Sequence, residues 1–479
     1  NLAPTLVNPC RLTRENERDM KHDLRYFLQS LKKQTPELLR QVKREVSPQW
    51  ELSAVQKRLE VQKRLPVLSF DRVTGSKMPV VTNLFASRAH LALALEVSPD
   101  EVVARFAEAQ KNGLPTKTVS TGPVKDIVLQ GDEATLSKLP LITHCEKDAG
   151  PYLTSGVTVM RDPETGKLNA GIYRNLRTSP TSLTMNMAPL CHGAEILSRA
   201  EAEGQHVQAA IIVGHHPALC MASQQRGELG DFELDTMGAL VEEPVDVVPA
   251  ETVDIPVPAD AEIVIEGTIR TDTWADDGPF GDYWLYYAPA KRARVFEITA
   301  ITHRHDAIFH DIFNVGPEHL VLFSLGMEGV VFDQLKRIVP ELQAIHVPVC
   351  GSGNLVYVQI KKGIDGQGIN AALAALGAYR FKCAIVVDED VDIYDDGKVL
   401  WAMMTRTQAD RSIFTVPGSY VSRVDPTGYP AWQMGDEGAR LLSTRLGIDA
   451  TKPMDPAFPE VAEPPRELWT TLDLARYID

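Results

Sequence analysis

The chain has 479 residues, of which 44% are hydrophobic and 24% are charged, as in globular proteins that bury a core. At roughly 100–200 residues per domain, this length predicts two to four domains. The formal net charge of −15 argues against nucleic acid and anionic membranes as partners, because both attract proteins with an excess of lysine and arginine.

The first part of the chain, to about residue 115, mixes helical and strand patterns. Apolar residues recur at helical spacing over 23–31, and 79–85 is a candidate buried strand. Residues 98–101 (Ser-Pro-Asp-Glu) are typical of a helix start, with proline at the first helical position and acids in the first turn. We predict an N-terminal α/β domain here.

From about 120 to 310, short runs rich in Val, Ile and Thr are separated by Gly, Pro, Asp and Asn. This density of short strands predicts a barrel or a sandwich. Helices are expected at 193–204 and after Pro217. The predicted strands are 153–161, 168–174, 182–186, 209–213, 262–269 and 293–302.

The last third alternates helices and strands: helix 329–338, strand 355–361, helix 366–377 and strand 383–387. Such alternation predicts a parallel or mixed sheet covered by helices. The tail from Pro453 has five prolines before Leu468 and suggests an extended arm that wraps a neighbouring subunit.

Targeting and membrane signals are missing from these patterns. No run reaches the roughly 18–20 consecutive apolar residues of a membrane helix. Residues 1–10 lack the basic-then-apolar layout of a signal peptide. The six cysteines are scattered without a Cys-x-x-Cys pair, which is typical of reduced thiols. We therefore expect a cytoplasmic protein that binds neither membrane nor nucleic acid.

Asn169, His192 and Glu233 form the first candidate site. An amide oxygen, a neutral imidazole and a carboxylate together suit a divalent ion such as Mn²⁺ or Mg²⁺, with phosphate oxygens completing its shell. Each residue alone also suits a structural role, since His192 stands just before a predicted helix and Glu233 is typical of a helix N-terminus.

Arg174, Asp277 and Asp282 form the second. Gly-Pro and a further Gly between the two aspartates impose a tight, irregular backbone. Two carboxylates on a rigid loop suit proton transfer, and an arginine beside them can hold one of them or a substrate carboxylate. The alternative is an aspartate-rich surface turn.

The third candidate is the turn 221–226 (Met-Ala-Ser-Gln-Gln-Arg), which offers hydroxyl, amide and guanidinium donors together. These donors suit a phosphate, and we take Ser223 and Gln224 as candidate cofactor ligands. An exposed loop without a ligand is the alternative.

Five ordered blocks of the chain resemble the UbiD family over nearly its whole length. The blocks are Asp23-Leu24-Arg25 with Phe27-Leu28; Leu139-Pro140 and Thr143-His144 leading into 150–156; 162–174, which includes Asn169 and Gly171-Ile172-Tyr173-Arg174; 262–267 followed by Gly278-Pro279-Phe280-Gly281; and 447–452. Their order and intervals exceed what chance similarity provides.

The resemblance implies a carboxy-lyase that decarboxylates its substrate reversibly and without oxidation, using prenylated FMN. It implies that a Mn²⁺-like ion, with K⁺ nearby, grips the flavin phosphate through Asn169, His192 and Glu233. It also implies that the cofactor is lined by Ile172, Arg174, Cys191 and Ser223.

The family's catalytic Arg-Glu-Glu set corresponds to Arg174, Asp277 and Asp282. Asp282 is a common variant, whereas Asp277 replaces a glutamate that is one methylene longer. In the implied mechanism the substrate adds to the electrophilic iminium of the flavin and carbon dioxide leaves. Asp282 then protonates the carbon, while Arg174, kept charged by Asp277, orients flavin and substrate.

The resemblance also implies a multidomain fold of mixed α+β and α/β type. The expected parts are an N-terminal α/β domain (1–115), a central split β-barrel like that of flavin reductases (116–315), a C-terminal α/β oligomerisation domain (316–452) and the arm (453–479). The expected partners are a carboxylic acid, CO₂, a flavin prenyltransferase that supplies the cofactor, and further copies in a homodimer or homohexamer.

We call residues 277–282, which carry the two aspartates, the acid loop. The aromatic and basic residues after it favour an aromatic or heteroaromatic acid as the substrate, with an α,β-unsaturated acid as the alternative. These residues are Trp284, Tyr286, Tyr287, His303, Arg304, His305 and His310. Two other functions stay open. One is a metal-dependent decarboxylase that needs no flavin. The other is a catalytically altered subunit that binds prenylated FMN, which the aspartate at 277 suggests.

Overall fold

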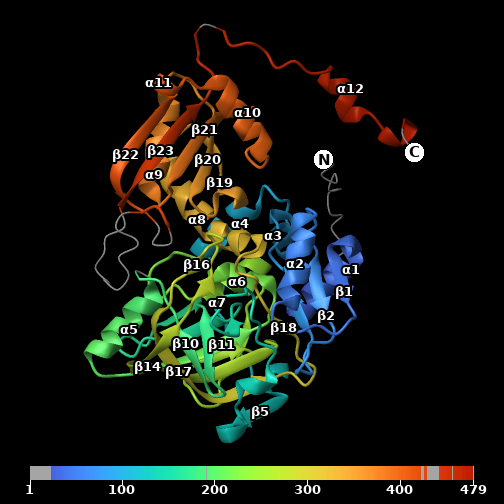
Figure 1. Cartoon of the computed structure of the whole chain (residues 1–479), viewed down its shortest axis with the longest axis vertical. Helices are drawn as coiled ribbons and strands as arrows, with labels where there is room; N and C mark the ends of the chain where they lie inside the picture. Colours follow the sequence, from blue (N-terminus) through green and yellow to red (C-terminus); the bar gives the residue numbers. More distant parts are fainter. Residues whose placement is uncertain (1–22, 190, 422–424, 429–441, 456, 478–479) are drawn as a thin grey trace.

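The computed structural model describes residues 23–189, 191–421, 425–428, 442–455 and 457–477. The first ten residues, on which the absence of a signal peptide was judged, lie outside these ranges. Figure 1 shows a strand-rich central region, an N-terminal region beside it, and a separate C-terminal sheet at the top. In the described part of the chain, no helix has both the length and the apolar content needed to cross a bilayer.

The N-terminal region packs helices against a four-stranded sheet of order β1-β2-β3-β18. Because β18 follows the central region in sequence, this sheet joins the two regions. Asp23 caps the first helix by accepting the N–H of Tyr26. The elements are α1 (Leu24–Gln34), β1 (Leu39–Val42), α2 (Glu51–Val61), β2 (Val67–Phe70), β3 (Val80–Thr82), α3 (Arg88–Leu95), α4 (Val102–Lys111) and β18 (Phe309–His310).

The fourth helix starts later than the sequence predicts. Its N-cap is Glu101, and Ser98 lies outside it. The Glu101 carboxylate accepts both the backbone N–H and the hydroxyl of Ser98, at 3.0 and 2.6 Å. The predicted first turn is therefore a separate turn that precedes the helix.

The central region is built on a nine-stranded sheet of order β6-β9-β10-β17-β14-β11-β7-β8, with β5 paired to β17. Its long antiparallel ribbon is β14 (Ile263–Asp277) with β17 (Lys291–His303). The other strands are β5 (Ile127–Gln130), β6 (Tyr152–Leu153), β7 (Val157–Arg161), β8 (Leu168–Ile172), β9 (Asn175–Ser179), β10 (Ser182–Met185) and β11 (Val207–Val213).

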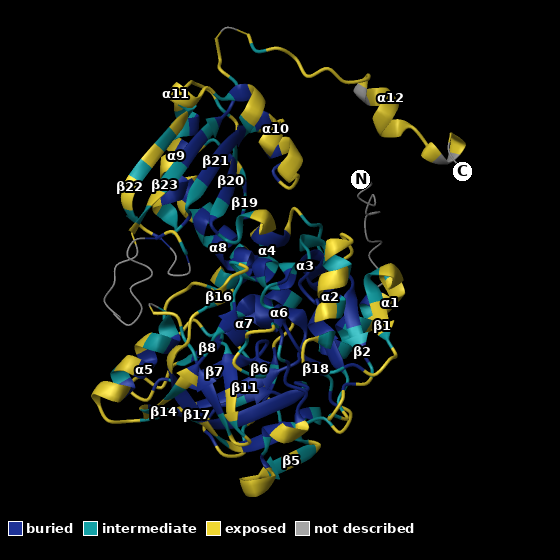
Figure 2. Cartoon of the chain, viewed as in Figure 1, coloured by how far each residue is buried: buried dark blue, intermediate teal, exposed yellow. Residues whose placement is uncertain are grey.

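Both faces of this sheet are covered. Along β11, Ala210 and Ile212 belong to one buried cluster, whereas Ala209, Ile211 and Val213 belong to another. Figure 2 shows this sheet as the buried centre of the region. The covering helices are α5 (His192–Ala202), α6 (Pro217–Ala222) and α7 (Glu233–Val241).

Smaller sheets complete the central region. A three-stranded sheet joins β4 (Lys117–Thr118), β12 (Asp246–Pro249) and β13 (Pro256–Pro258), and a two-stranded one joins β15 (Phe280–Gly281) and β16 (Tyr287–Ala288). The predicted strand 153–161 is in fact two strands, β6 and β7. Among the described residues the large sheet runs from β6 to β8 without a pairing that closes it, so the split barrel stays a prediction.

The C-terminal region is a five-stranded sheet of order β19-β20-β21-β23-β22, reached through the 22-residue helix α8 (Pro317–Ile338). The predicted helix 329–338 is the second half of α8. The three central strands are parallel, as the alternating pattern predicts. The elements are β19 (Leu342–His346), β20 (Leu355–Ile360), α9 (Gln367–Ala378), β21 (Cys383–Asp388), α10 (Asp396–Arg406), α11 (Ala409–Ser412), β22 (Ile413–Tyr420) and β23 (Leu442–Ala450).

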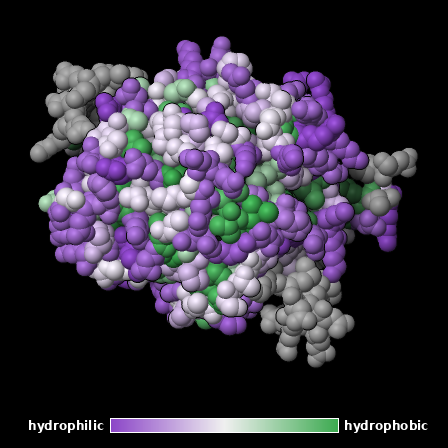
Figure 3. All heavy atoms as spheres, turned by 90° about the horizontal axis from the view of Figure 1, so that it is seen from below, coloured by the Kyte–Doolittle hydropathy of each residue, from purple (hydrophilic) through white to green (hydrophobic). Residues whose placement is uncertain are grey.

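Beyond β23 the chain forms an arm that ends in α12 (Arg466–Thr471) and projects away from the body in Figure 1. Large apolar side chains on it are exposed, namely Leu468, Trp469, Leu472, Leu474 and Tyr477. The opposite end of the molecule, seen from below in Figure 3, is largely hydrophilic with small separate apolar spots. Exposed apolar side chains like those of the arm are typical of a segment that packs against a partner.

Candidate functional site

Two of the three predicted metal ligands are in direct contact. Asn169 lies on β8, and Glu233 is the first residue of α7. The Asn169 Nδ2 donates to Glu233 Oε1 at 2.8 Å, and the Ala170 N–H donates to Oε2 at 2.6 Å. Both side chains are buried, and the Asn169 Oδ1 is buried without a hydrogen-bond partner.

The electrostatics of this pair fit a cation. Burial raises the pKa of Glu233 to about 8, although the N–H groups and amides around it act in the opposite direction. A positive charge at this point would stabilise the carboxylate and use the spare Asn169 oxygen. Carboxylate and amide oxygens are the ligands that hard divalent ions prefer.

His192 is the first residue of α5 and forms no hydrogen bond with Asn169 or Glu233 in the structure. The residue before it, Cys191, and Glu233 both act electrostatically on the phenol of Tyr173. Burial raises the pKa of the Tyr173 phenol, and the charges of Cys191 and Glu233 raise it further. In the described ranges, no three or more His, Cys, Asp or Glu side chains are arranged to bind a metal.

Arg174 and Asp277 form a buried ion pair. The Arg174 Nη2 and Nε lie 2.9 and 3.1 Å from Asp277 Oδ1. Asp277 is the last residue of β14 and is fully buried, so the alternative of an aspartate-rich surface turn does not hold for this residue. Its carboxylate also accepts the hydroxyls of Thr184 at 3.0 Å and Tyr152 at 3.3 Å.

An aromatic ring completes this arrangement. The Arg174 Cζ lies 4.8 Å from the centroid of the Phe280 ring, and the centroids of the Phe280 and Tyr152 rings are 4.4 Å apart. The guanidinium is thus fixed by a carboxylate and by a ring. Burial raises the pKa of Tyr152 well above its ordinary value, and Asp277 adds to this, so the phenol stays a donor.

Tyr152 and Thr184 are functional neighbours that were not among the predicted site residues. They come from β6 and β10 and reach Asp277 through the pairing of the sheet. Tyr152 lies in one of the blocks that carry the family resemblance, which was the available signal. No pattern in the sequence pointed to Thr184.

A second segment supports the backbone after Asp277. Gly278 has a φ of 98°, which favours glycine. The N–H of Gly281 donates to Asp148 Oδ1 at 2.8 Å, and the N–H of Ala149 donates to the Pro279 carbonyl at 2.9 Å. A Cβ at 281 would come 2.7 Å from the Cys145 Sγ, so this close approach requires glycine.

Asp282 is separate from the ion pair. It is half-buried, and its Oδ1 accepts the N–H of Tyr283 at 2.7 Å. No hydrogen bond or ion pair joins it to Arg174 or Asp277. Its charge acts on His319 of α8: burial lowers the pKa of this imidazole more than Asp282 raises it. The structure therefore unites two members of the predicted catalytic trio and places the third beyond Gly281.

The remaining candidate cofactor ligands surround the same sheet edge and helix starts. Ile172 ends β8 and is half-buried. Cys191 caps α5, and burial raises the pKa of its thiol. Ser223 ends α6, donates to the Cys220 carbonyl at 2.7 Å and accepts the Gln224 amide at 3.1 Å. No hydrogen bond joins Ile172, Cys191 or Ser223 to the side chains of Asn169 and Glu233.

The residues expected to surround the substrate are dispersed. Tyr286 is 65% exposed. His305 is exposed and contacts Asp126, whereas His310 is buried on β18. The structure does not bring these three to Arg174.

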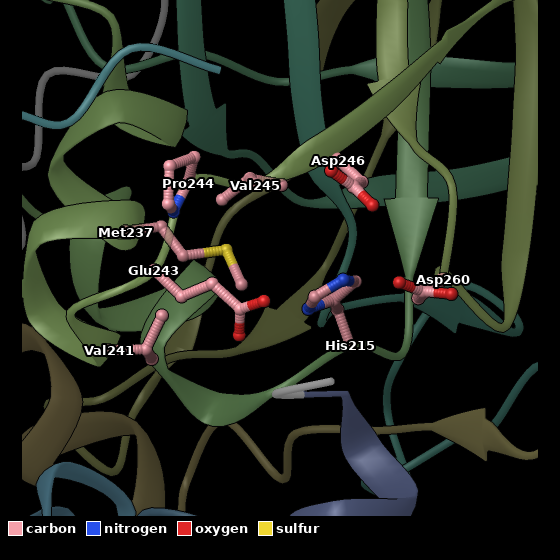
Figure 4. Close-up of a pocket in the computed structure, with 8 residues that line it drawn as sticks. All are labelled: His215, Met237, Val241, Glu243, Pro244, Val245, Asp246 and Asp260. Carbon is pink, nitrogen blue, oxygen red and sulfur yellow. The ribbon is translucent and has the colours of Figure 1, made fainter. Parts of the chain in front are cut away.

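Figure 4 shows a small recess at the far end of α7 from Glu233. It is lined by His215, Glu243, Asp246 and Asp260 together with apolar residues. None of the predicted site residues takes part in it, and its acidic lining does not suit a carboxylic acid. The candidate site therefore stays with the Asn169–Glu233 contact on β8 and the Arg174–Asp277 pair just beyond the end of this strand.

Three family models match the chain in succession. They are the N-terminal, Rift-related and C-terminal domains of 3-octaprenyl-4-hydroxybenzoate carboxy-lyase, over residues 31–110, 117–317 and 321–450. An anhydromevalonate phosphate decarboxylase of Methanosarcina mazei is 33% identical over 417 residues, which are 86% of this chain and 92% of that protein.

Solved structures agree. The UbiD-class enzyme HmfF of Pelotomaculum thermopropionicum with FMN superposes with a TM-score of 0.89 at 35% identity, covering 95% of this chain and all of that one. The evolved dimeric form of HmfF with prFMN superposes with a TM-score of 0.85 at 33% identity, covering 96% of this chain and 100% of that one. The apo 3,4-dihydroxybenzoic acid decarboxylase of Enterobacter cloacae superposes with a TM-score of 0.85 at 28% identity, covering 93% of this chain and 98% of that one.

The models span the three regions of the fold, and the relatives match over most of their own length. Both findings confirm the resemblance inferred from the sequence blocks: this chain belongs to the UbiD family of carboxy-lyases.

Proposed function

We propose that this carboxy-lyase decarboxylates a small carboxylic acid reversibly, with prenylated FMN as cofactor and Arg174, Asp277 and Asp282 as its catalytic residues. The observation that carries the proposal is the Arg174 guanidinium, held between the buried Asp277 carboxylate and the Phe280 ring. An arginine fixed in this way is pre-organised to bind a carboxylate.

The cofactor, when bound, supplies an electron sink for the electron pair left by departing CO₂. Asn169 and Glu233 fit a metal ion that holds its phosphate, with His192 as the third candidate ligand. Arg174 follows Asn169 by five residues. At about 3.3 Å per residue, the Cα atoms of Asn169 and Arg174 lie up to roughly 16 Å apart, so a ligand that contacts both residues is elongated. The FMN and prFMN in the HmfF structures support this assignment.

The side chains of this chain then have separate tasks. Arg174 binds and orients the anionic groups at the reacting end. Asp277 keeps the guanidinium charged and in place, and Tyr152 and Thr184 fix Asp277. Asp282 protonates the carbon from which CO₂ departs; its Oδ1 accepts the N–H of Tyr283, so Oδ2 is the oxygen that would transfer the proton.

Two kinds of substrate have support among the relatives. The 3,4-dihydroxybenzoic acid decarboxylases favour an aromatic or heteroaromatic acid. The anhydromevalonate phosphate decarboxylases favour a phosphorylated acid, for which the α,β-unsaturated class is the nearest of our predictions. We retain both classes.

The other partners belong to the proposal as well. They are Mn²⁺ or Mg²⁺ with K⁺ at the phosphate end, a flavin prenyltransferase as cofactor supplier, and a homodimer or homohexamer in the cytoplasm. The dimeric form of HmfF supports self-association.

The test is to produce the chain together with a flavin prenyltransferase, then record the absorbance spectrum and the mass of the ligand that it releases. A panel of aromatic and acrylic acids is scored in parallel by exchange with ¹³C-bicarbonate. We expect prenylated FMN and exchange with at least one acid. Exchange in flavin-free protein would favour the metal-dependent reaction, and a bound chromophore without exchange would favour the altered subunit.

A further inference from the structure

Two arginines from different regions lie beside one tyrosine ring. Arg226 belongs to the turn after α6, and its Cζ is 5.3 Å from the centroid of Tyr379. Arg380 follows α9 in the C-terminal region, and its Cζ is 5.4 Å from the same centroid. The junction between the central region and the C-terminal sheet thus carries two positive charges.

No carboxylate that the structure describes pairs with either charge, although Arg380 donates to the Tyr379 hydroxyl at 3.3 Å. Neither Arg226 nor Arg380 forms an ion pair with any residue that the structure describes, although the chain has 64 acidic residues against 49 basic ones. The nearby Lys382, by contrast, is paired with Asp425 at 2.9 Å. Each Cζ lies within 5.4 Å of the Tyr379 centroid, so the two guanidinium groups are at most about 11 Å apart, and an anion bound by both would offset their mutual repulsion.

A row of aromatic rings connects these arginines with the acid loop. The Arg226 Cζ lies 6.0 Å from the centroid of Phe323 on α8, and Phe323 lies 5.3 Å from Tyr283. Tyr283 directly follows Asp282 and donates to its carboxylate. An acid that reacts beside Asp282 and extends along this row would bring its far end to the two guanidinium groups.

We propose that Arg226 and Arg380 bind a second anionic group on the substrate, a carboxylate or a phosphate, at the end away from the reacting carboxylate. The substrate is then a dianionic acid with an aromatic or unsaturated middle. This inference rests on the proposed function and narrows its substrate class. The phosphate of the flavin has the same chemistry, so the test separates these two sources.

The experiment compares cinnamate with 4-carboxycinnamate, which differ by one distal carboxylate. The variants are Arg226→Gln and Arg380→Gln, and the control is Arg337→Gln. Arg337 is an exposed arginine at the other end of α8, about 21 Å along the helix from Phe323. All proteins are produced with the flavin prenyltransferase, and turnover and flavin content are measured for each.

We expect each test variant to raise the KM for 4-carboxycinnamate about 10-fold or more, as for the loss of a charge-assisted hydrogen bond. The KM for cinnamate, the kcat values and the flavin content stay within about twofold, and Arg337→Gln behaves as the wild type. Loss of flavin with equal damage to both acids would assign the arginines to the cofactor phosphate. Unchanged KM values with a lower melting temperature would assign them to packing between regions. Either result overturns the inference.

If the wild type turns over neither acid, the proposed function fails for this class, and anion binding is measured directly. The shift in melting temperature caused by 4-carboxycinnamate is compared with that caused by cinnamate. A larger shift in the wild type, lost in Arg226→Gln and kept in Arg337→Gln, supports the anion site independently of turnover. Equal shifts in all proteins contradict it.

Discussion

The Asp277 carboxylate is held by three side-chain donors instead of water. Arg174, Tyr152 and Thr184 all direct hydrogen bonds to it inside a fully buried site. A neutral amide at this position would leave the arginine charge buried without compensation, which is costlier than losing a surface pair.

We therefore predict that Asp277→Asn lowers kcat/KM by at least about 100-fold, the usual range for losing a positioned acid–base group. It also lowers the free energy of unfolding by about 3–5 kcal/mol, because Arg174 loses its buried partner. Steady-state exchange of ¹³C-bicarbonate and urea unfolding measure the two effects.

Asp276→Asn is the matched control, since that side chain is 86% exposed and pairs only weakly with Arg292. It should leave both quantities nearly unchanged. Asp277→Glu keeps the charge and should recover most of the lost turnover. Equal activity of Asp277→Asn and the wild type would contradict the catalytic role.

Glu318, next to the start of α8, predicts a pH effect on stability. Burial raises its pKa to about 8, the charge of Asp311 adds to this, and backbone N–H groups of 83–85 oppose it. Because the folded pKa lies above the unfolded value, the contribution to stability is full below about pH 4.5 and is lost as the pH rises through about 8.

Glu318→Gln removes this titration. Between pH 6 and pH 9, the wild type should lose more stability than the variant by on the order of a few kcal/mol. Urea unfolding at both pH values measures the difference. Parallel pH profiles for the two proteins would show that Glu318 is already ionised in the folded state.

Some contacts between the candidate site residues could be predicted from the sequence, and others could not. The contact of Asn169 with Glu233 and that of Arg174 with Asp277 follow the family pattern in the sequence. The two hydroxyl partners of Asp277 were not predicted: Tyr152 was noted only as part of a family block, and Thr184 reaches the carboxylate only across paired strands. The roles of His192, Ser223 and Gln224 stay predictions, since no contact in the structure joins them to the carboxylate of Glu233.

Among the elements, the segment 145–149 supports the backbone of 279–281, and a buried pair fixes the start of this segment. The His144 Nε2 lies 2.8 Å from Asp311 Oδ2, and Thr154 donates to Asp311 at 3.1 Å. Burial lowers the pKa of His144, but Asp311 and Asp148 raise it by more, so the net shift favours the imidazolium relative to a histidine in water.

Asp311→Asn should therefore destabilise the protein by about 3–5 kcal/mol, because it leaves a buried imidazolium without its partner. Asp126→Asn breaks the exposed pair with His305 and should cost less than about 1 kcal/mol. Urea unfolding of both variants measures the contrast. Equal effects would mean that His144 is neutral in the folded protein.

Regular elements with clean patterns were predicted closely. The strands β20 and β21 and the helix α9 lie within one residue of their predicted bounds. The length of β14 was not predicted, because 270–277 is polar and resembles a turn. These residues become a strand through pairing with β17, a contact that no local pattern encodes.

At the scale of the whole molecule, the exposed apolar side chains of α12 predict self-association. Leu468→Asn combined with Trp469→Ser should lower the mass measured by light scattering, because the arm then buries less apolar surface against a second copy. Leu285→Asn is the control, since Leu285 is 59% exposed, against 64% for Leu468, and lies outside the arm. An unchanged mass in the double variant would exclude the arm from the interface.

The arm also sets a limit on where a second copy can sit. Residues 451–465 are the 15 residues that connect β23 to α12. At about 3.1 Å per residue, their full extension is about 46 Å. If α12 binds a second copy, its binding surface must lie within that distance, where the connection holds α12 at an effective concentration near the millimolar range. Shortening the connection until it no longer spans the distance would then weaken assembly without altering any residue that makes contact.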